Sequence, residues 1–160
     1  MKTAKLGVSF AAAVLGMVSL LGDAKAELQT NTHGAAFVAY DAGNANDIDY
    51  LPWGVRTLAS SSRRVIASVV FHPEAAYYQY VTVSGSNYSG QTTDYTVYTH
   101  DHDGNLRYSS WHETSEESFN DGVIMETGSE DDDVFVSVMA TLPASGNGVL
   151  RGVTVYPWHW

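Results

Sequence analysis

Residues 134–142 carry the pattern that most constrains the fold, because their side chains alternate strictly in type. Every second position of this segment holds an aliphatic residue: Val134, Val136, Val138, Ala140 and Leu142. A β-strand points successive side chains to opposite faces, so these five share one face. The segment therefore predicts a strand with one buried face, and we predict Val136, Val138 and Ala140 in the core.

The same kind of alternation recurs in short windows from residue 35 onward, with Gly, Asn, Asp or Ser between the windows. We predict strands at residues 35–40, 65–71, 77–84, 92–99, 105–111, 123–126, 134–142 and 149–156. Short strands separated by turn residues indicate an all-β protein. The predicted fold is an antiparallel β-sandwich of about eight strands, Ig-like or jelly-roll-like, with Val153 and Val155 also in its core.

Two hairpins are expected from the turn residues. Residues 143–148 contain glycines and an asparagine, which tolerate positive φ, so strands 134–142 and 149–156 are predicted to pair with each other. Asp103-Gly104 lies between two alternating segments, which is a strong hairpin signal. Taking these two as the turn places His102 opposite Asn105 and His100 opposite Arg107.

The first 26 residues resemble a secretory signal peptide. Lys2 and Lys5 precede an apolar stretch, and Ala24-Lys25-Ala26 offers a cleavage site of the A-x-A type. We therefore predict a signal peptide at 1–26, one β-sandwich domain at 27–160, and an exported protein that is secreted or periplasmic.

The net charge of the exported chain disfavours some classes of binding partner. Residues 27–160 contain five arginines, no lysine and 17 acidic residues, a net charge of −12 with neutral histidines. Such a surface repels phosphate backbones and anionic lipid headgroups, so we expect neither nucleic-acid binding nor electrostatic membrane attachment. The partner is expected to be an extracellular ligand or protein.

Three segments carry a resemblance to a known group of proteins. They are residues 69–73, residues 92–98 with the following Asp103-Gly104-Asn105, and residues 136–143 continuing through 148–153. Together they resemble uncharacterised secreted bacterial proteins, common in myxobacteria and other proteobacteria, that have a small β-sandwich. The resemblance implies this fold and no activity.

One departure from that pattern concerns cysteine. Where the related proteins tend to carry cysteines, this chain has His72, Tyr95 and Ala140, and it contains no cysteine at all. Any disulfide joining those strands in relatives is therefore absent here. A domain of this size buries about two-thirds of its unfolded surface and can fold without one.

A metal site is one hypothesis for the histidine-rich hairpin. His100 and His102 are two residues apart, Asp101 and Asp103 supply carboxylates, and His112 follows on the partner strand. These ligand types suit Zn²⁺, Cu²⁺ or Ni²⁺. The alternative is a polar hairpin tip, and Arg107 opposite His100 would repel a cation. We therefore expect no cofactor and at most weak metal binding.

Catalytic signals are sparse. The chain has no cysteine and no G-x-S-x-G motif. Two carboxylates for glycoside hydrolysis could come from Glu116, Glu117, Glu126 or the acidic cluster at 130–133, but the sequence does not fix the distance between them. Enzymatic activity is not predicted.

Aromatic residues give the remaining signal, because exposed Tyr and Trp offer flat apolar faces with a polar edge. The predicted ligand-binding residues are Tyr77, Tyr78, Tyr80, Tyr88 and Trp111. The alternative is that Tyr78 and Tyr80 fill the core of the sandwich.

Three hypotheses follow for function. The first is a secreted, non-catalytic β-sandwich that binds a glycan or another extracellular or cell-surface partner. The second is a small outer-membrane β-barrel, since Tyr156, Trp158 and Trp160 alternate to the C-terminus, although Pro157 interrupts that strand. The third is a metal-binding exported protein that uses the His/Asp hairpin.

Overall fold

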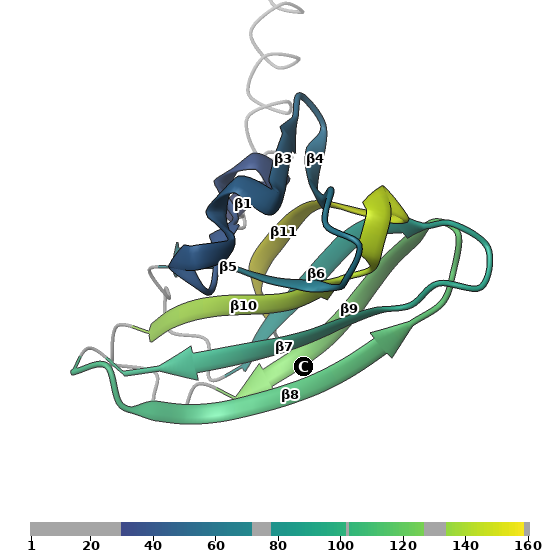
Figure 1. The fold of residues 1–160 in the computed structure, drawn as a ribbon. Helices are drawn as coiled ribbons and strands as arrows, with labels where there is room; N and C mark the ends of the chain where they lie inside the picture. The colour runs from purple at the N-terminus through teal and green to yellow at the C-terminus, as the bar shows by residue number, and fades with distance from the viewer. Residues whose placement is uncertain (1–29, 72–77, 102, 127–133, 159–160) are drawn as a thin grey trace, which may run out of the picture.

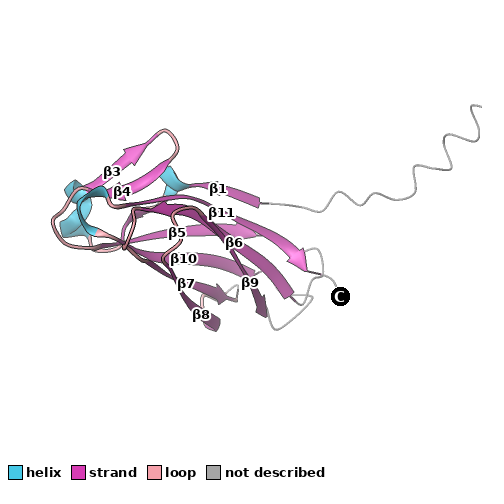
Figure 2. Ribbon diagram, turned by 90° about the vertical axis from the view of Figure 1, so that its right-hand side faces the viewer, coloured by secondary structure: helices cyan, strands magenta, loops and turns pink. Residues whose placement is uncertain are grey.

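The computed structural model describes residues 30–71, 78–101, 103–126 and 134–158. Two antiparallel sheets pack face to face in this part of the chain (Figure 1 and Figure 2), which confirms the predicted β-sandwich. The first 26 residues and Trp160 lie outside the described residues. No helix in the described ranges is long and apolar enough to cross a membrane.

Sheet A, as we name it, has strand order β3-β4-β11-β6-β9, with β1 pairing onto β11. Sheet B has the order β2-β5-β10-β7-β8. The strands of sheet A are β1 (Thr30–His33), β3 (Ile48–Leu51), β4 (Gly54–Thr57), β6 (Tyr78–Asn87), β9 (Phe119–Glu126) and β11 (Gly148–Trp158). Those of sheet B are β2 (Val38–Ala39), β5 (Arg63–Phe71), β7 (Thr93–His100), β8 (Leu106–Thr114) and β10 (Val134–Leu142).

The core lies between the sheets and follows the alternation read from the sequence. Val136, Val138 and Ala140 of β10 are at most 1% exposed, and Val153 and Val155 of β11 are at most 2% exposed. The five predicted core residues are therefore confirmed. Strand β10 also has the predicted bounds, and the other strands predicted beyond residue 60 are present with shifted ends.

The predicted hairpin between β10 and β11 is wrong. Strand β10 pairs with β5 and β7 in sheet B, whereas β11 pairs with β1, β4 and β6 in sheet A. The connection contains a short 3-10 helix, η3 (Ala144–Gly146), with positive φ at Ser145 and Gly146, and it carries the chain from one sheet to the other. Both strands do bury one face, but they bury it in the same core from opposite sides.

The N-terminal part of the domain also differs from expectation. The predicted strand at 35–40 is a 3-10 helix, η1 (Gly34–Ala36), followed by the two-residue strand β2. A second 3-10 helix, η2 (Ala42–Asp47), leads into the β3–β4 hairpin, which was not predicted. This hairpin lies at one end of the sandwich (Figure 2). A Cβ atom on Gly34 or on Gly54 would overlap the Leu150 carbonyl oxygen of β11, so both glycines permit close backbone approach.

The hairpin formed by β7 and β8 is confirmed, with Asp103-Gly104 at its tip. Its register pairs Thr99 with Tyr108 and continues without a break to Thr93 and Thr114, as the turn residues predicted. An irregularity beyond Thr99 shifts the pairing, so that His100 lies opposite Leu106 and not opposite Arg107. The expected charge repulsion between His100 and Arg107 is corrected accordingly.

Candidate functional site

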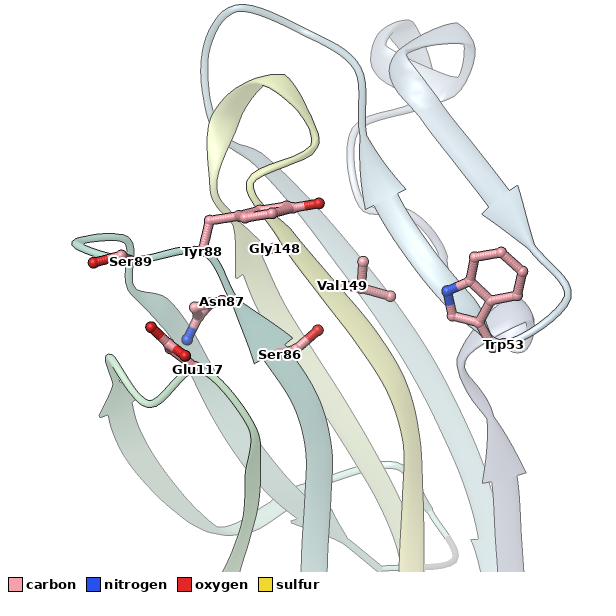
Figure 3. A pocket seen from close by; sticks show the side chains of 8 residues that line it. All are labelled: Trp53, Ser86, Asn87, Tyr88, Ser89, Glu117, Gly148 and Val149. Atoms are coloured by element: carbon pink, nitrogen blue, oxygen red, sulfur yellow. The ribbon is translucent and has the colours of Figure 1, made fainter.

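A groove of about 510 Å³ opens at one end of the sandwich (Figure 3). Three connections surround it: the β3–β4 turn, the β6–β7 loop and the β8–β9 turn. Its lining residues are Trp53, Ser86, Asn87, Tyr88, Ser89, Glu117, Gly148 and Val149. The groove therefore combines residues that are up to 96 positions apart in the sequence.

The floor of the groove is the outer face of sheet A where β6 ends and β11 begins. Ser86 and Val149 are directly paired across these strands, so their side chains stand next to each other on this face. Gly148 pairs with Asn87 beside them. A Cβ atom on Gly148 would come within 2.6 Å of the Pro143 ring, so glycine is needed for the close approach of these segments.

Asn87 holds the surrounding connections together. Its side chain is buried, its Nδ2 donates to the carbonyl oxygens of Thr114 at 3.0 Å and Glu116 at 3.2 Å, and its Oδ1 accepts from the Thr93 hydroxyl at 2.6 Å. These bonds tie the β8–β9 turn to the end of β6. Asn87 thereby positions the backbone next to Glu117 at the groove.

Two exposed aromatic side chains flank the floor. Tyr88 is 65% exposed and Trp53 is 58% exposed. Figure 3 shows Val149 between these two rings, with Ser86 below the Tyr88 ring and Glu117 on the Tyr88 side. An aromatic ring held at each side of an open groove offers flat apolar faces to a ligand.

Backbone contacts hold each aromatic in place. The Tyr88 amide donates to the Asn147 carbonyl at 2.9 Å, and the Tyr88 carbonyl accepts from the Gln91 amide at 3.0 Å. This closes a turn in which Gly90 has a φ of 77°. Trp53 occupies the two-residue turn between β3 and β4, and Gly54 directly after it packs against the β11 backbone.

The lining of the groove combines polar and apolar side chains. Ser86 and Ser89 supply hydroxyls, Glu117 supplies a carboxylate, and Tyr88, Trp53 and Val149 supply apolar surface. Hydroxyls and carboxylates exchange hydrogen bonds with polar ligands, while aromatic faces cover their apolar sides. Small-ligand sites commonly combine these two kinds of surface.

Comparison with known proteins supports the fold. No protein-family model matches the chain, and no curated protein matches its sequence. A family 35 carbohydrate-binding module from Clostridium thermocellum matches with a TM-score of 0.52 and 8% identity, over 82% of this chain and 99% of that chain. This chain has a β-sandwich fold like that of carbohydrate-binding modules.

A second solved structure gives the same result. It contains the CBM22-1 and GH10 modules of an endo-1,4-β-D-xylanase from Clostridium thermocellum, complexed with xylohexaose. The match has a TM-score of 0.50 and 9% identity, and it covers 82% of this chain and 28% of that longer chain. At such identities the likeness is one of fold.

The aromatic residues predicted as one binding surface lie in three separate places. Tyr88 lines the groove, and Trp111, 63% exposed, lies on the outer face of sheet B opposite Thr96. Tyr78 and Tyr80 are half-buried on the outer face of sheet A, whereas Tyr77 lies outside the described residues.

The alternative that Tyr78 and Tyr80 fill the core is wrong. Gln79 and Val81, at the alternate positions of β6, point inward instead and are fully buried. The Tyr80 ring lies 5.0 Å from the Tyr156 ring and 5.4 Å from the Trp158 ring, measured between centroids. These outward aromatics form a cluster on sheet A, six residues along β6 from Ser86 and about 20 Å away.

Of the eight lining residues only Tyr88 was predicted as ligand-binding, and the seven others include Trp53, Ser86, Ser89 and Glu117. Trp53 follows a proline in a two-residue turn, and Glu117 lies in a polar connection, so neither is part of an alternating pattern. An exposed tryptophan at a turn was the available sequence signal. Their convergence depends on which loops share one end of the sandwich.

A smaller hollow of about 280 Å³ lies on the outer face of sheet B and contains His100. Its other lining residues are Tyr40, Ile66, Tyr98, Ser137 and Met139. His100 is thus placed beside Tyr98, with 6.2 Å between the ring centroids. Besides His100, this lining is mainly apolar, with hydroxyl groups on Tyr40, Tyr98 and Ser137.

Asp101, another predicted metal ligand, stabilises the hairpin turn. Its carboxylate accepts hydrogen bonds from the amides of Asp103 at 3.1 Å and Asn105 at 2.8 Å, and from the Asn105 side chain at 3.2 Å. Arg107 forms an ion pair with it at 3.1 Å. The turn thereby uses both carboxylate oxygens.

His112 lies well away from this turn. It is paired with Tyr95, and the two rings stack at 5.2 Å between centroids while Nε2 lies 2.9 Å from the Ser110 hydroxyl oxygen. Six residues of β8 separate it from Leu106, the partner of His100, which corresponds to about 20 Å. Burial and the nearby Asp121 carboxylate raise the pKa of Tyr95, so it stays a neutral phenol.

The predicted metal ligands are therefore only partly assembled. In the ranges that the structure describes, no three His, Asp or Glu side chains group closely enough to hold a metal ion. His102 lies outside these ranges. Metal binding at the hairpin stays a prediction.

The pH response of the turn follows from Asp101. Burial by itself raises the pKa of this carboxyl, but the hydrogen bonds from Asn105 and Asp103 and the Arg107 charge outweigh it and lower the pKa below its usual value. The unfolded value is about 3.9, so the carboxylate stabilises the turn above that pH and this contribution is lost as the pH falls through the lower, folded pKa.

We therefore expect the amide chemical shifts of Asp103 and Asn105 to stay constant from neutral pH down to about pH 5, and to move only below about pH 4. An NMR titration measures this directly. The variant Asp101→Asn should lose the transition at the Asn105 amide, and a transition of that amide in the native chain centred well above pH 4 would contradict the assignment.

Proposed function

We propose that this protein binds a glycan, without hydrolysing it, in the groove between Trp53 and Tyr88. The observation that carries the proposal is the pair of exposed aromatic rings on either side of a floor with Ser86 and next to Glu117. Sugar rings present apolar faces to aromatic side chains and hydroxyls to polar ones. The fold neighbours that are carbohydrate-binding modules also support glycan binding.

The absence of hydrolysis in this proposal rests on the carboxylates. Glycoside hydrolysis commonly needs two, about 5 to 10 Å apart across the scissile bond. Among the described residues that line the groove, Glu117 is the single carboxylate. Glu126 lies at the far end of β9, so it supplies no second carboxylate there.

A ligand titration followed by NMR tests the proposal. We expect one or more neutral or amino-sugar oligosaccharides from a panel to shift the amides of Ser86, Tyr88, Ser89 and Val149 and the indole signal of Trp53. The assignment to this groove would be overturned if the shifts were confined to the Tyr80–Trp158 cluster or to the hollow at His100. It would also be overturned if no glycan in the panel caused a shift.

We also propose that the protein acts outside the cytoplasm. The residues that support export are Lys2 and Lys5, the apolar stretch after them, and the Ala24-Lys25-Ala26 cleavage motif. The intact mass of the protein purified from its native source should correspond to a chain that begins at Glu27. A mass that includes residues 1–26 would contradict export with cleavage.

A further inference from the structure

The positive charges of the described domain are nearly all neutralised. Four of its five arginines form an ion pair with an aspartate: Arg56 with Asp49 at 2.8 Å, Arg63 with Asp47 at 2.7 Å, Arg64 with Asp41 at 3.3 Å, and Arg107 with Asp101 at 3.1 Å. The remaining one, Arg151, is exposed on β11. Several carboxylates therefore have no arginine partner in these pairs, among them Asp94, Asp121, Glu113, Glu116 and Glu117.

Three glutamates without a cationic partner lie on the segment that leads into the β8–β9 turn. Glu113, Glu116 and Glu117 lie at the end of β8 and in the β8–β9 turn, and all three are exposed. No ion pair joins them to any residue that the structure describes. Glu117 lines the groove, and the described lining contains no lysine, arginine or histidine.

The Glu117 carboxylate can accept hydrogen bonds from sugar hydroxyls, but a ligand that also carries a positive charge gains more from it. Covering the carboxylate with a neutral ligand removes water from the charge without supplying an opposite charge. A ligand ammonium group would compensate that loss through a charge-assisted hydrogen bond. The faces of Tyr88 and Trp53 also attract a cation.

We propose that the groove selects glycans with free, protonated amino groups, and that Glu117 is the residue that determines this specificity. The inference rests on the proposed glycan-binding function and names its ligand class. Uronic-acid and sulfated glycans are disfavoured by the same charge. N-acetylated glycans have the same ring but carry no ammonium, so they are the matched comparison.

Calorimetry with two oligosaccharides of equal length tests the proposal: a β-1,4-linked glucosamine oligomer and its fully N-acetylated form, at a pH where the amines are protonated. We expect the amine form to bind roughly fivefold more tightly, the size of an exposed ion pair. The preference should weaken as salt is added, because salt screens exposed charges.

The variant Glu117→Gln should abolish the preference for the amine form over the N-acetylated form. Glu113→Gln removes the same charge from β8 without touching the groove, and it should keep the preference. An equal affinity of the native protein for both oligomers, or a preference that survives Glu117→Gln, would overturn the assignment of Glu117.

This result is distinguishable from failure of glycan binding itself. If both oligomers bind equally and shift the groove residues, the proposed function stands and the charge selection is wrong. If neither oligomer nor any other glycan shifts the groove residues, the proposed function fails first.

Discussion

Val138→Asp is expected to unfold the protein. Val138 is fully buried at the middle of β10, paired with Ala67 of β5 and Val97 of β7. An aspartate there would place an unpaired carboxylate between the two sheets, far from water. The cost is several kcal/mol, comparable to the total stability of about 5 to 15 kcal/mol of a typical domain.

Urea denaturation followed by circular dichroism measures this effect. Phe135→Asp is the matched control, because Phe135 lies on the same strand with the opposite orientation and is 38% exposed. The control should lose about 1 kcal/mol or less, as most substitutions at exposed positions do. A Val138→Asp variant as stable as the control would show that the register of β10 is misassigned.

The double variant Trp53→Ala/Tyr88→Ala is expected to abolish measurable glycan binding. Each ring is more than half exposed, so its removal should leave the fold intact. Truncating an aromatic anchor of a binding site commonly costs more than about 1 kcal/mol, so we expect a loss of roughly tenfold in affinity for each ring. The two effects should add, because the floor separates the rings in Figure 3.

Trp111→Ala is the control for this prediction. Trp111 is as exposed as Trp53 and Tyr88, but it lies on the outer face of sheet B. Its removal should leave the affinity within twofold of the native value. Loss of binding in Trp111→Ala, together with normal binding in the double variant, would place the site on sheet B. A denaturation curve of the double variant shows whether it is folded.

Local patterns in the sequence determined the parts of the structure that depend on neighbouring residues. The alternation from Val136 to Leu142 determined which side of β10 is buried, because side chains on a strand alternate with a period of two. Asp103-Gly104 determined the β7–β8 hairpin and most of its register, because a tight turn aligns the strands on either side of it.

The sequence did not determine the buried face of a strand that carries apolar or aromatic residues on both faces. In β6, Tyr78 and Tyr80 alternate with Gln79 and Val81, and either set can serve as the buried face. The structure buries Gln79 and Val81, which leaves the tyrosines on the outside. Packing of the whole sheet against sheet B decides between the two.

Only the tertiary structure decided which strands pair and which loops meet. Strands β10 and β11 are consecutive and both amphipathic, yet they belong to different sheets. The sequence could not show this, because two strands that face each other across the core have the same alternation as two strands paired side by side. The groove depends on that arrangement. Trp53, Tyr88 and Glu117 come from three connections that share one end of the sandwich, and no local pattern encodes contacts between residues so far apart in the chain.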